Sequence, residues 1–453
     1  MKTRFRTLAV NAGTAGAVLL GMIACNVQES LLELDQPQII SPSDAANPTG
    51  AVALATGAIG FVKTYLNNIS GIWQYSAVFT DEMKSGDTFG VTNEADQRTV
   101  DTNNGTFAAI WNGLQQSRGH LRDGVNALRQ YAPTETAKLG EMYLGMGFVE
   151  MTLGQNWCNG IPLGETVLGV PQYTVPLTNA QVFAVAIARF DTALTVLSGT
   201  DAQTLNIRDA VLVAKARAQV DIGQFAAAAA TVASVPTSAV YLMTYAQTSM
   251  SNGWWTQVSS NRRLTVGDSF DVTGVIKNAL PFASANDPRV KVNRSTIKSF
   301  DGSTPFNDLL NWGREDPIPL LSGLDARLIE AEAKLQTNDL AGMVTILNAL
   351  RAAPPKIGNF TPKTMADLAV PTTLSSAVSL YFREKAFWQF GRGERLSDLR
   401  RLVRQYGRSQ DVVFPVGTFF KNNGFPYGSQ VAIPISDQEK TNTNFLGCID
   451  LKA

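Results

Sequence analysis

The chain has 453 residues, of which 45% are hydrophobic and 17% are charged, so it has ample apolar material for a sizeable core and is not of a disordered composition. Its 38 Lys and Arg residues balance 38 Asp and Glu residues, and this balance gives no reason to expect a nucleic-acid partner. Length alone would allow two or three domains.

Residues 1–24 have the pattern of an export signal. Three basic residues, Lys2, Arg4 and Arg6, precede a short and mostly apolar stretch that ends at Ala24, which is typical of secretion. The stretch is too short and too rich in Gly and Ala to span a membrane comfortably, and no later segment has the long uncharged apolar run of a membrane helix.

The residue after this leader is a cysteine. Met22-Ile23-Ala24-Cys25 resembles a bacterial lipobox, with Met22 where leucine is usual. On this interpretation Cys25 is acylated and becomes the mature N-terminus, held to the membrane by its acyl chains, palmitate among them. Removal of residues 1–24 takes away three positive charges, so 35 basic residues face 38 acidic ones and the net charge becomes −3. The alternative is an ordinary cleaved signal peptide with an incidental cysteine.

The body of the chain is predicted to be mostly α-helical. Residues 25–46 read as an acidic tether, and residues 47–453 as one domain. Asn47 can cap a helix whose first position is Pro48, and Gly71 ends it. Further apolar residues at helical spacing predict helices over residues 107–128, 134–153, 179–197, 207–219, 225–235, 324–335, 340–350 and 374–404.

Two pairs of these helices are joined by short turns. Gly223-Gln224-Phe225 connects the first pair, where small residues and an aromatic after the turn resemble a tetratricopeptide helix–turn–helix. Residues 337–339 connect the second pair. Two isolated generic hairpins fit the spacing equally well.

Two long regions look irregular. Residues 71–105 and 236–320 mix aromatics with Gly, Asn, Ser and Asp, which indicates loops. Loops of this length in a compact protein are usually functional. From residue 411 onward the chain reads as turns and short extended segments.

Four segments carry a family resemblance. Residues 382–401, FREKAFWQFGRGERLSDLRR, resemble the C-terminal signature of SusD/RagB proteins, although Arg392 stands where an acidic residue is common. Residues 324–333, 154–163 and 433–444 resemble other family segments. With the lipobox, the resemblance spans nearly the whole mature chain.

The signature segment reads as a helix, a Gly-x-Gly turn and a second helix. We expect it to be structural, without a ligand or a catalytic role. The side chains expected to be buried are Phe387, Trp388 and Leu399, and those expected to pair across the turn are Glu384, Arg395 and Asp398.

The resemblance implies a SusD-like fold, a helical scaffold of tetratricopeptide-like pairs overlaid by binding loops. It implies a surface-exposed lipoprotein of the outer membrane that sits on a SusC-like, TonB-dependent transporter and captures a nutrient for it. Members bind glycans, or peptides in the RagB branch, and we expect a glycan here, with no cofactor and no enzymatic activity. The alternatives are a helical scaffold for protein partners and a surface hydrolase.

Little in the sequence supports catalysis. His120 is the only histidine, and we expect it on a helix surface; no Gly-x-Ser-x-Gly elbow, Walker loop or Cys/His metal cluster is present. Carboxylate pairs for glycoside hydrolysis have no sequence spacing of their own. Asp81 and Glu82 are the candidates, but adjacent acids near a turn are usually just solvated.

Aromatic residues in the irregular regions are the candidate ligand contacts. Sugars pack their C–H faces on flat rings that have amides and carboxylates nearby. We predict that these residues converge on a shallow groove: Trp73, Tyr75, Phe79, Asp81, Trp254, Trp255 and Trp312. The alternative is that the rings fill the core beneath the loops.

Cys158 and Cys448 are the only cysteines left once Cys25 is acylated. An exported protein meets an oxidising compartment, so we expect them to form a disulfide. A bridge closing so long a loop is worth on the order of 5 kcal/mol in the chain-entropy model. The alternative is two free thiols far apart.

Overall fold

A computed structural model describes residues 44–453 except 168–169 and 422–423. The leader, Cys25 and most of the tether lie outside the described residues. The chain is mostly α-helical with short strands, as expected. The scaffold helices are α2 (Pro48–Asn67), α5 (Gly105–Tyr131), α6 (Thr136–Asn156), α7 (Asn179–Val196), α8 (Ala202–Asp221), α9 (Phe225–Val232), α10 (Gly323–Gln336) and α11 (Leu340–Ala352).

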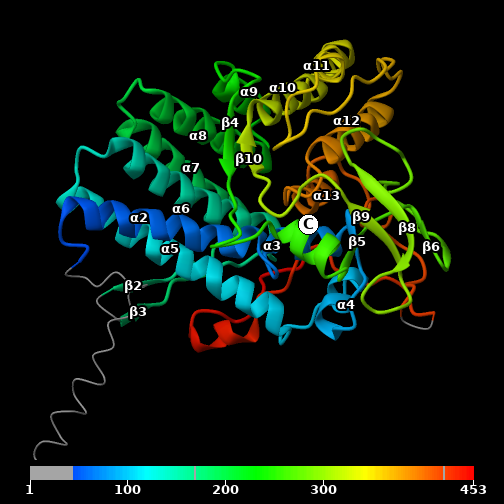
Figure 1. Cartoon of the computed structure of the whole chain (residues 1–453), viewed down its shortest axis with the longest axis horizontal. Helices are drawn as coiled ribbons and strands as arrows, with labels where there is room; N and C mark the ends of the chain where they lie inside the picture. The colour runs from blue at the N-terminus through cyan, green and yellow to red at the C-terminus, as the bar shows by residue number, and fades with distance from the viewer. Residues whose placement is uncertain (1–43, 168–169, 422–423) are drawn as a thin grey trace, which may run out of the picture.

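These helices form one continuous stack. Along it α2 packs on α5, and each helix from α5 to α11 packs on the next in the chain (Figure 1). The α8–α9 turn contains Gly223 at φ +78°, and the α10–α11 turn contains Asn338 at φ 59°, a conformation that glycine and asparagine tolerate best. Because α9 also packs on α10, the two predicted hairpins are neighbours in the stack and not isolated pairs.

The first helix begins as the sequence predicts. Asn47 accepts a hydrogen bond from the N–H of Gly50, and Pro48 occupies the first turn. The stretch Pro48–Phe79 also has the length and hydropathy of a membrane-crossing helix. This is weak support for a membrane span, because the helix is interrupted after Asn67 and every residue of α3 (Ile72–Phe79) is buried.

The prediction of a loop over residues 71–105 is wrong. This region contains α3, β1 (Met83–Ser85) and α4 (Gly90–Gln97), and β1 pairs antiparallel with the distant β5 (Leu264–Val266). These elements are short, and burial against distant segments stabilises them. The sequence around them is rich in turn-forming residues, and for this reason it predicted a loop.

Residues 236–320 hold most of the other strands. They are β4 (Val240–Met243), β6 (Phe270–Asp271), β7 (Gly274–Val275), β8 (Val292–Lys298), β9 (Pro305–Leu309) and β10 (Ile318–Ser322), with a π-helical turn η1 (Trp255–Ser260). The strands pair two by two: β4 with β10, β6 with β7, and β8 with β9. The β5, β6, β8 and β9 strands lie at the right-hand end in Figure 1, away from α7 and α8.

The signature segment forms α12 (Leu374–Trp388), a turn and α13 (Arg395–Arg404). Phe387, Trp388 and Leu399 are buried, as expected. In the turn, Gly391 and Gly393 have φ values of +69° and +76°. A Cβ atom on Gly393 would lie 2.3 Å from the ring of Trp73, so the turn requires glycine for both backbone and space.

Glu384, Arg395 and Asp398 all form ion pairs, but not with one another. Arg395 binds Asp81 at 2.7 Å, Asp398 binds Lys385 at 2.5 Å, and Glu384 binds Arg289 at 2.7 Å. Arg392 binds Asp325 of α10 at 2.7 Å. The expected pairing among Glu384, Arg395 and Asp398 is therefore corrected. Asp398 pairs across the turn with Lys385, whereas the partners of Glu384, Arg395 and Arg392 come from other elements and fasten the signature to the scaffold.

The predicted disulfide is confirmed. Cys158 and Cys448 are bonded, with their Cα atoms 5.9 Å apart. Cys158 follows α6, and its neighbour Asn159 bridges to Asp450. The C-terminal segment is thereby fastened beside the hairpin of β2 (Glu165–Val167) and β3 (Val170–Gln172).

Candidate functional site

The aromatic residues predicted to bind a ligand lie almost entirely in the core. The buried members are Trp73, Tyr75, Phe79, Trp254 and Trp312, together with Asp81. None of these rings offers a face to solvent on which a sugar could stack. For these six residues the ligand-binding prediction is wrong, and the alternative that the rings fill the core is correct.

Three of the tryptophans do converge, on the signature turn. The indole N–H of Trp254 donates to the carbonyl of Gly391 at 2.8 Å. The rings of Trp312 and Trp73 lie against Gly391 and Gly393. Segments distant in sequence therefore meet, but they enclose a buried glycine turn instead of a groove.

Trp255 is the exception in the predicted set. It is half-buried, and the guanidinium carbon of Arg314 lies 5.3 Å from its ring centroid. Its part in ligand binding stays a prediction.

Asp81 and Glu82 are not a solvated pair. Both oxygens of Asp81 accept from Arg395, and Glu82 accepts from the N–H of Gly391 at 2.9 Å. Burial raises the pKa of Glu82 to about 8, although the Gly391 N–H and Arg395 act in the opposite direction. The two carboxylates are enclosed in the core, so they are not placed to flank a glycosidic bond.

His120 lies on the surface of α5, as expected. Its ring packs edge-on against Phe61 at a centroid distance of 4.5 Å.

A hollow at the strand end of the molecule brings an aromatic ring together with amide, hydroxyl and carboxylate groups. It lies between α4, the β6–β7 and β8–β9 turns and the C-terminal loop, and its volume is about 380 Å³. We call it the aromatic hollow. Its lining residues are Asp87, Asn93, Val272, Asp301, Ser303, Thr304, Phe420 and Lys421.

Lys421 organises one wall of the aromatic hollow. Its ammonium group donates to the carbonyl of Asp87 at 2.7 Å and to the side chain of Asn93 at 3.2 Å, and it pairs with Asp301 at 2.8 Å. Burial would raise the pKa of Asp301, but hydrogen bonds from Lys421 and Thr304 lower it to about 2. The wall therefore presents fixed, satisfied charges at neutral pH.

Two exposed rings flank an arginine beside this wall. The guanidinium carbon of Arg263 lies 4.5 Å from the ring centroid of Phe89 and 4.0 Å from that of Phe300. Arg263 also pairs with Asp87, which lines the hollow. Phe89 and Phe300 are 55% and 47% exposed. The cation holds both rings in place, and their exposed surface lies beside amides, hydroxyls and carboxylates.

The sequence analysis missed Phe89 and Phe300 because it gave weight to tryptophan and tyrosine. The available signal was their position at turns. Phe89 follows Ser85-Gly86-Asp87-Thr88, and Phe300 precedes Asp301-Gly302-Ser303. A large apolar residue beside a turn does not belong to the apolar face of a helix or strand, so no periodic pattern predicts that it is buried.

Solved structures with the same architecture are known, although no protein-family model and no curated protein matches the sequence. A SusD superfamily protein from Bacteroides vulgatus superposes with a TM-score of 0.62 at 14% identity, covering 89% of this chain and 99% of that one. A SusD-like carbohydrate binding protein from the same organism gives 0.63 at 13% identity, covering 88% and 98%. A SusD-like carbohydrate binding protein from Bacteroides fragilis gives 0.65 at 11% identity, covering 88% and 99%. The chain has a SusD-like fold.

Proposed function

We propose that the protein is a non-enzymatic lipoprotein on the outer face of the outer membrane. It binds an oligosaccharide in the aromatic hollow and delivers it to a TonB-dependent, SusC-like transporter. The observation that carries the binding role is the clamp of Arg263 between two half-exposed rings at the edge of a polar hollow. Two structural neighbours described as carbohydrate binding support the ligand class.

Binding measurements test the site. Purified protein is titrated calorimetrically with oligosaccharides of six to eight sugars from starch, cellulose, xylan and mannan, and with mixed peptides of similar length. For the glycan that binds, Phe300→Ala and Phe89→Ala should each weaken affinity at least about fivefold, since loss of a stacking ring costs about 1 kcal/mol. Both rings are exposed, so the fold should be unchanged.

Phe360→Ala is the control for a ring beneath a cation elsewhere on the chain; Phe360 is half-buried and packs on the core, so the fold of this variant is checked by circular dichroism before affinities are compared. Phe360 also carries a cation over its ring, with the Lys291 ammonium 4.3 Å from the centroid. Lys291 lies just before the start of β8, whereas Phe300 lies just after the end of this strand. The two cation–ring contacts are therefore at opposite ends of β8. Equal losses for Phe360→Ala and Phe300→Ala, or no loss for either hollow variant, would remove the site. If only peptides bind, the ligand is a peptide and not an oligosaccharide.

The anchor is tested separately. The position of Cys25 behind a basic, apolar leader motivates lipidation, so Cys25→Ser should release the protein from the outer membrane or leave an uncleaved precursor. Cell fractionation with immunoblotting measures this. A variant that fractionates as the wild type does would show that Cys25 is not the anchor.

A further inference from the structure

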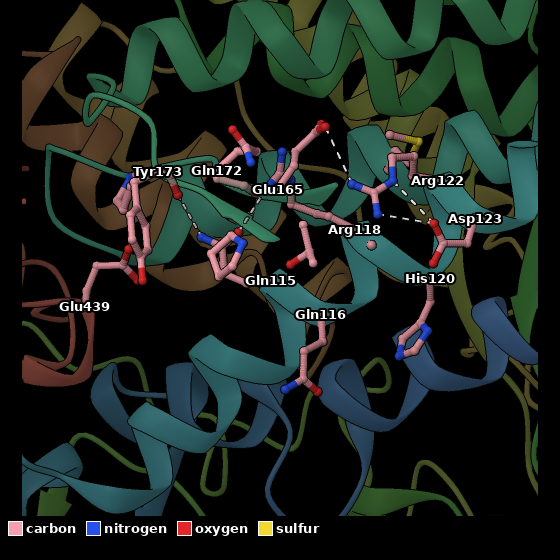
Figure 2. Close-up of a pocket in the computed structure, with 16 residues that line it drawn as sticks. Gln115, Gln116, Arg118, His120, Arg122, Asp123, Glu165, Gln172, Tyr173 and Glu439 are labelled. Atoms are coloured by element: carbon pink, nitrogen blue, oxygen red, sulfur yellow. Dashed lines mark hydrogen bonds and ion pairs between the residues drawn. The ribbon is translucent and has the colours of Figure 1, made fainter. Parts of the chain in front are cut away.

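A second hollow lies between α5, the β2–β3 hairpin and the C-terminal segment, away from the strands β6 and β8 (Figure 1). We call it the hairpin hollow; its volume is about 530 Å³, within the roughly 300–1,000 Å³ typical of small-molecule sites. Figure 2 shows Tyr173 and Glu439 at one end of it and Arg122, Asp123 and His120 at the other.

The floor of the hairpin hollow is rigid. Buried Arg118 donates to Glu150 at 3.2 Å, to the carbonyl of Gly164 at 3.0 Å and to Gln115 at 3.1 Å. These bonds fasten the start of the β2–β3 hairpin to α5. The Cys158–Cys448 disulfide fastens the C-terminal segment to the same loop. A site with fixed walls loses less conformational freedom when a ligand binds.

Both arginines of the hairpin hollow already have carboxylate partners inside the protein. Arg122 pairs with Asp123 at 3.2 Å and with Glu165 at 3.5 Å. Arg118 pairs with Glu150. At the other end, the two carboxylate oxygens of Glu439 accept from the Trp111 indole and from Asn442. Neither arginine is therefore free to bind an anionic ligand, and the carboxylate of Glu439, which has no cation as its partner, already accepts two hydrogen bonds.

Three polar side chains of the hairpin hollow are left free. In the part of the chain that the structure describes, the side chains of Gln116 and His120 and the hydroxyl of Tyr173 have no hydrogen-bond partner, and all three residues are exposed. The Tyr173 ring is 49% exposed. An open ring beside amide and imidazole groups suits a neutral molecule with many hydroxyls, whose C–H faces pack on the ring.

We propose that the hairpin hollow is a second binding site, for a short neutral oligosaccharide, independent of the aromatic hollow. One chain then holds saccharide at two separated places. For a long glycan that reaches both, the second contact is intramolecular, and overall affinity rises without any new interface.

The test isolates the second site. In the variant Phe89→Ala/Phe300→Ala, ligand-observed NMR measures affinity for neutral trisaccharides built of glucose, mannose, galactose or xylose, with trigalacturonate and trilysine as charged comparators. We expect a neutral trisaccharide to bind this variant, and Tyr173→Ala in the same background to weaken binding at least about fivefold. Val175→Ala, an exposed residue two positions along that does not line the hollow, should change nothing.

Several results would overturn the proposal. They are failure of every neutral trisaccharide to bind the Phe89→Ala/Phe300→Ala variant, an affinity unchanged within twofold by Tyr173→Ala, and preference for trilysine or trigalacturonate. A different result would show that the aromatic hollow is not a binding site. If Tyr173→Ala alone abolishes saccharide binding while Phe300→Ala has no effect, the hairpin hollow stands and the proposed primary site does not.

Discussion

Arg395 at the signature turn and Arg263 at the aromatic hollow each pair with an aspartate beside aromatic rings. At the turn, the side chains of Arg395 and Asp81 are 6% and 0% exposed, and the neighbouring rings are buried. At the hollow, the Arg263 side chain is 21% exposed, and its two rings are about half exposed. The same chemical groups make a structural core in one place and an open surface in the other, so residue type alone does not identify a binding site.

The largest expected difference between the two regions is the effect of removing the arginine. Arg395→Met leaves Asp81 buried without its partner, which should lower the free energy of unfolding by about 3–5 kcal/mol. Arg263→Met leaves Asp87, whose side chain is 4% exposed, with hydrogen bonds from three other donors, so it should cost less, about 1–2 kcal/mol. Urea denaturation measures both. Equal losses would mean that burial does not separate the two regions.

The glycine turn should also be sensitive. Gly393→Ala places a Cβ atom against Trp73 at a positive φ, and the overpacking and backbone strain together should cost about 2–4 kcal/mol. Gly407→Ala is the matched control, because Gly407 has φ +64° but nothing within 4 Å of an added Cβ. It should cost about 1 kcal/mol, and thermal unfolding compares the two. A Gly393→Ala variant no less stable than Gly407→Ala would contradict the tight packing of the turn.

The smallest expected effect is a pH dependence of the free energy of unfolding, which arises from a buried carboxyl group in the core and not from the aromatic hollow. The pKa of Glu82 is about 8 in the folded protein and 4.5 in its ordinary state. Between these values the folded state holds a proton that the unfolded state has released, so stability falls as pH rises. In the wild type this lowers the free energy of unfolding by about 2 kcal/mol between pH 5 and 6.5. Glu82→Gln should abolish this decrease, because glutamine does not titrate.

Asp301 in the aromatic hollow provides the contrast. Its folded pKa of about 2 lies below its ordinary value of 3.8, so it is ionised in both states above pH 5. Asp301→Asn should therefore shift stability equally at pH 5 and 6.5. Urea denaturation at both pH values checks the two variants, and a Glu82→Gln protein with the wild-type pH slope would show that Glu82 is ionised when folded.

The sequence by itself determined the features that depend on neighbouring residues. Apolar spacing located the scaffold helices, and Asn47 and Pro48 marked the first helix start. The predicted export leader, with the two cysteines that remain beside Cys25, indicated the disulfide. The signature segment indicated the SusD-like fold. These inferences succeed because helical periodicity, capping and cysteine number are properties of short segments or of composition.

Only the tertiary structure decided which rings and charges face water. Trp73 became core because Gly393, distant in the chain, leaves room for its ring. Phe89 stays at the surface, where Arg263 from another segment lies over its ring. Burial of a side chain is set by all the segments packed around it, and an isolated stretch of sequence carries no record of which segments those will be.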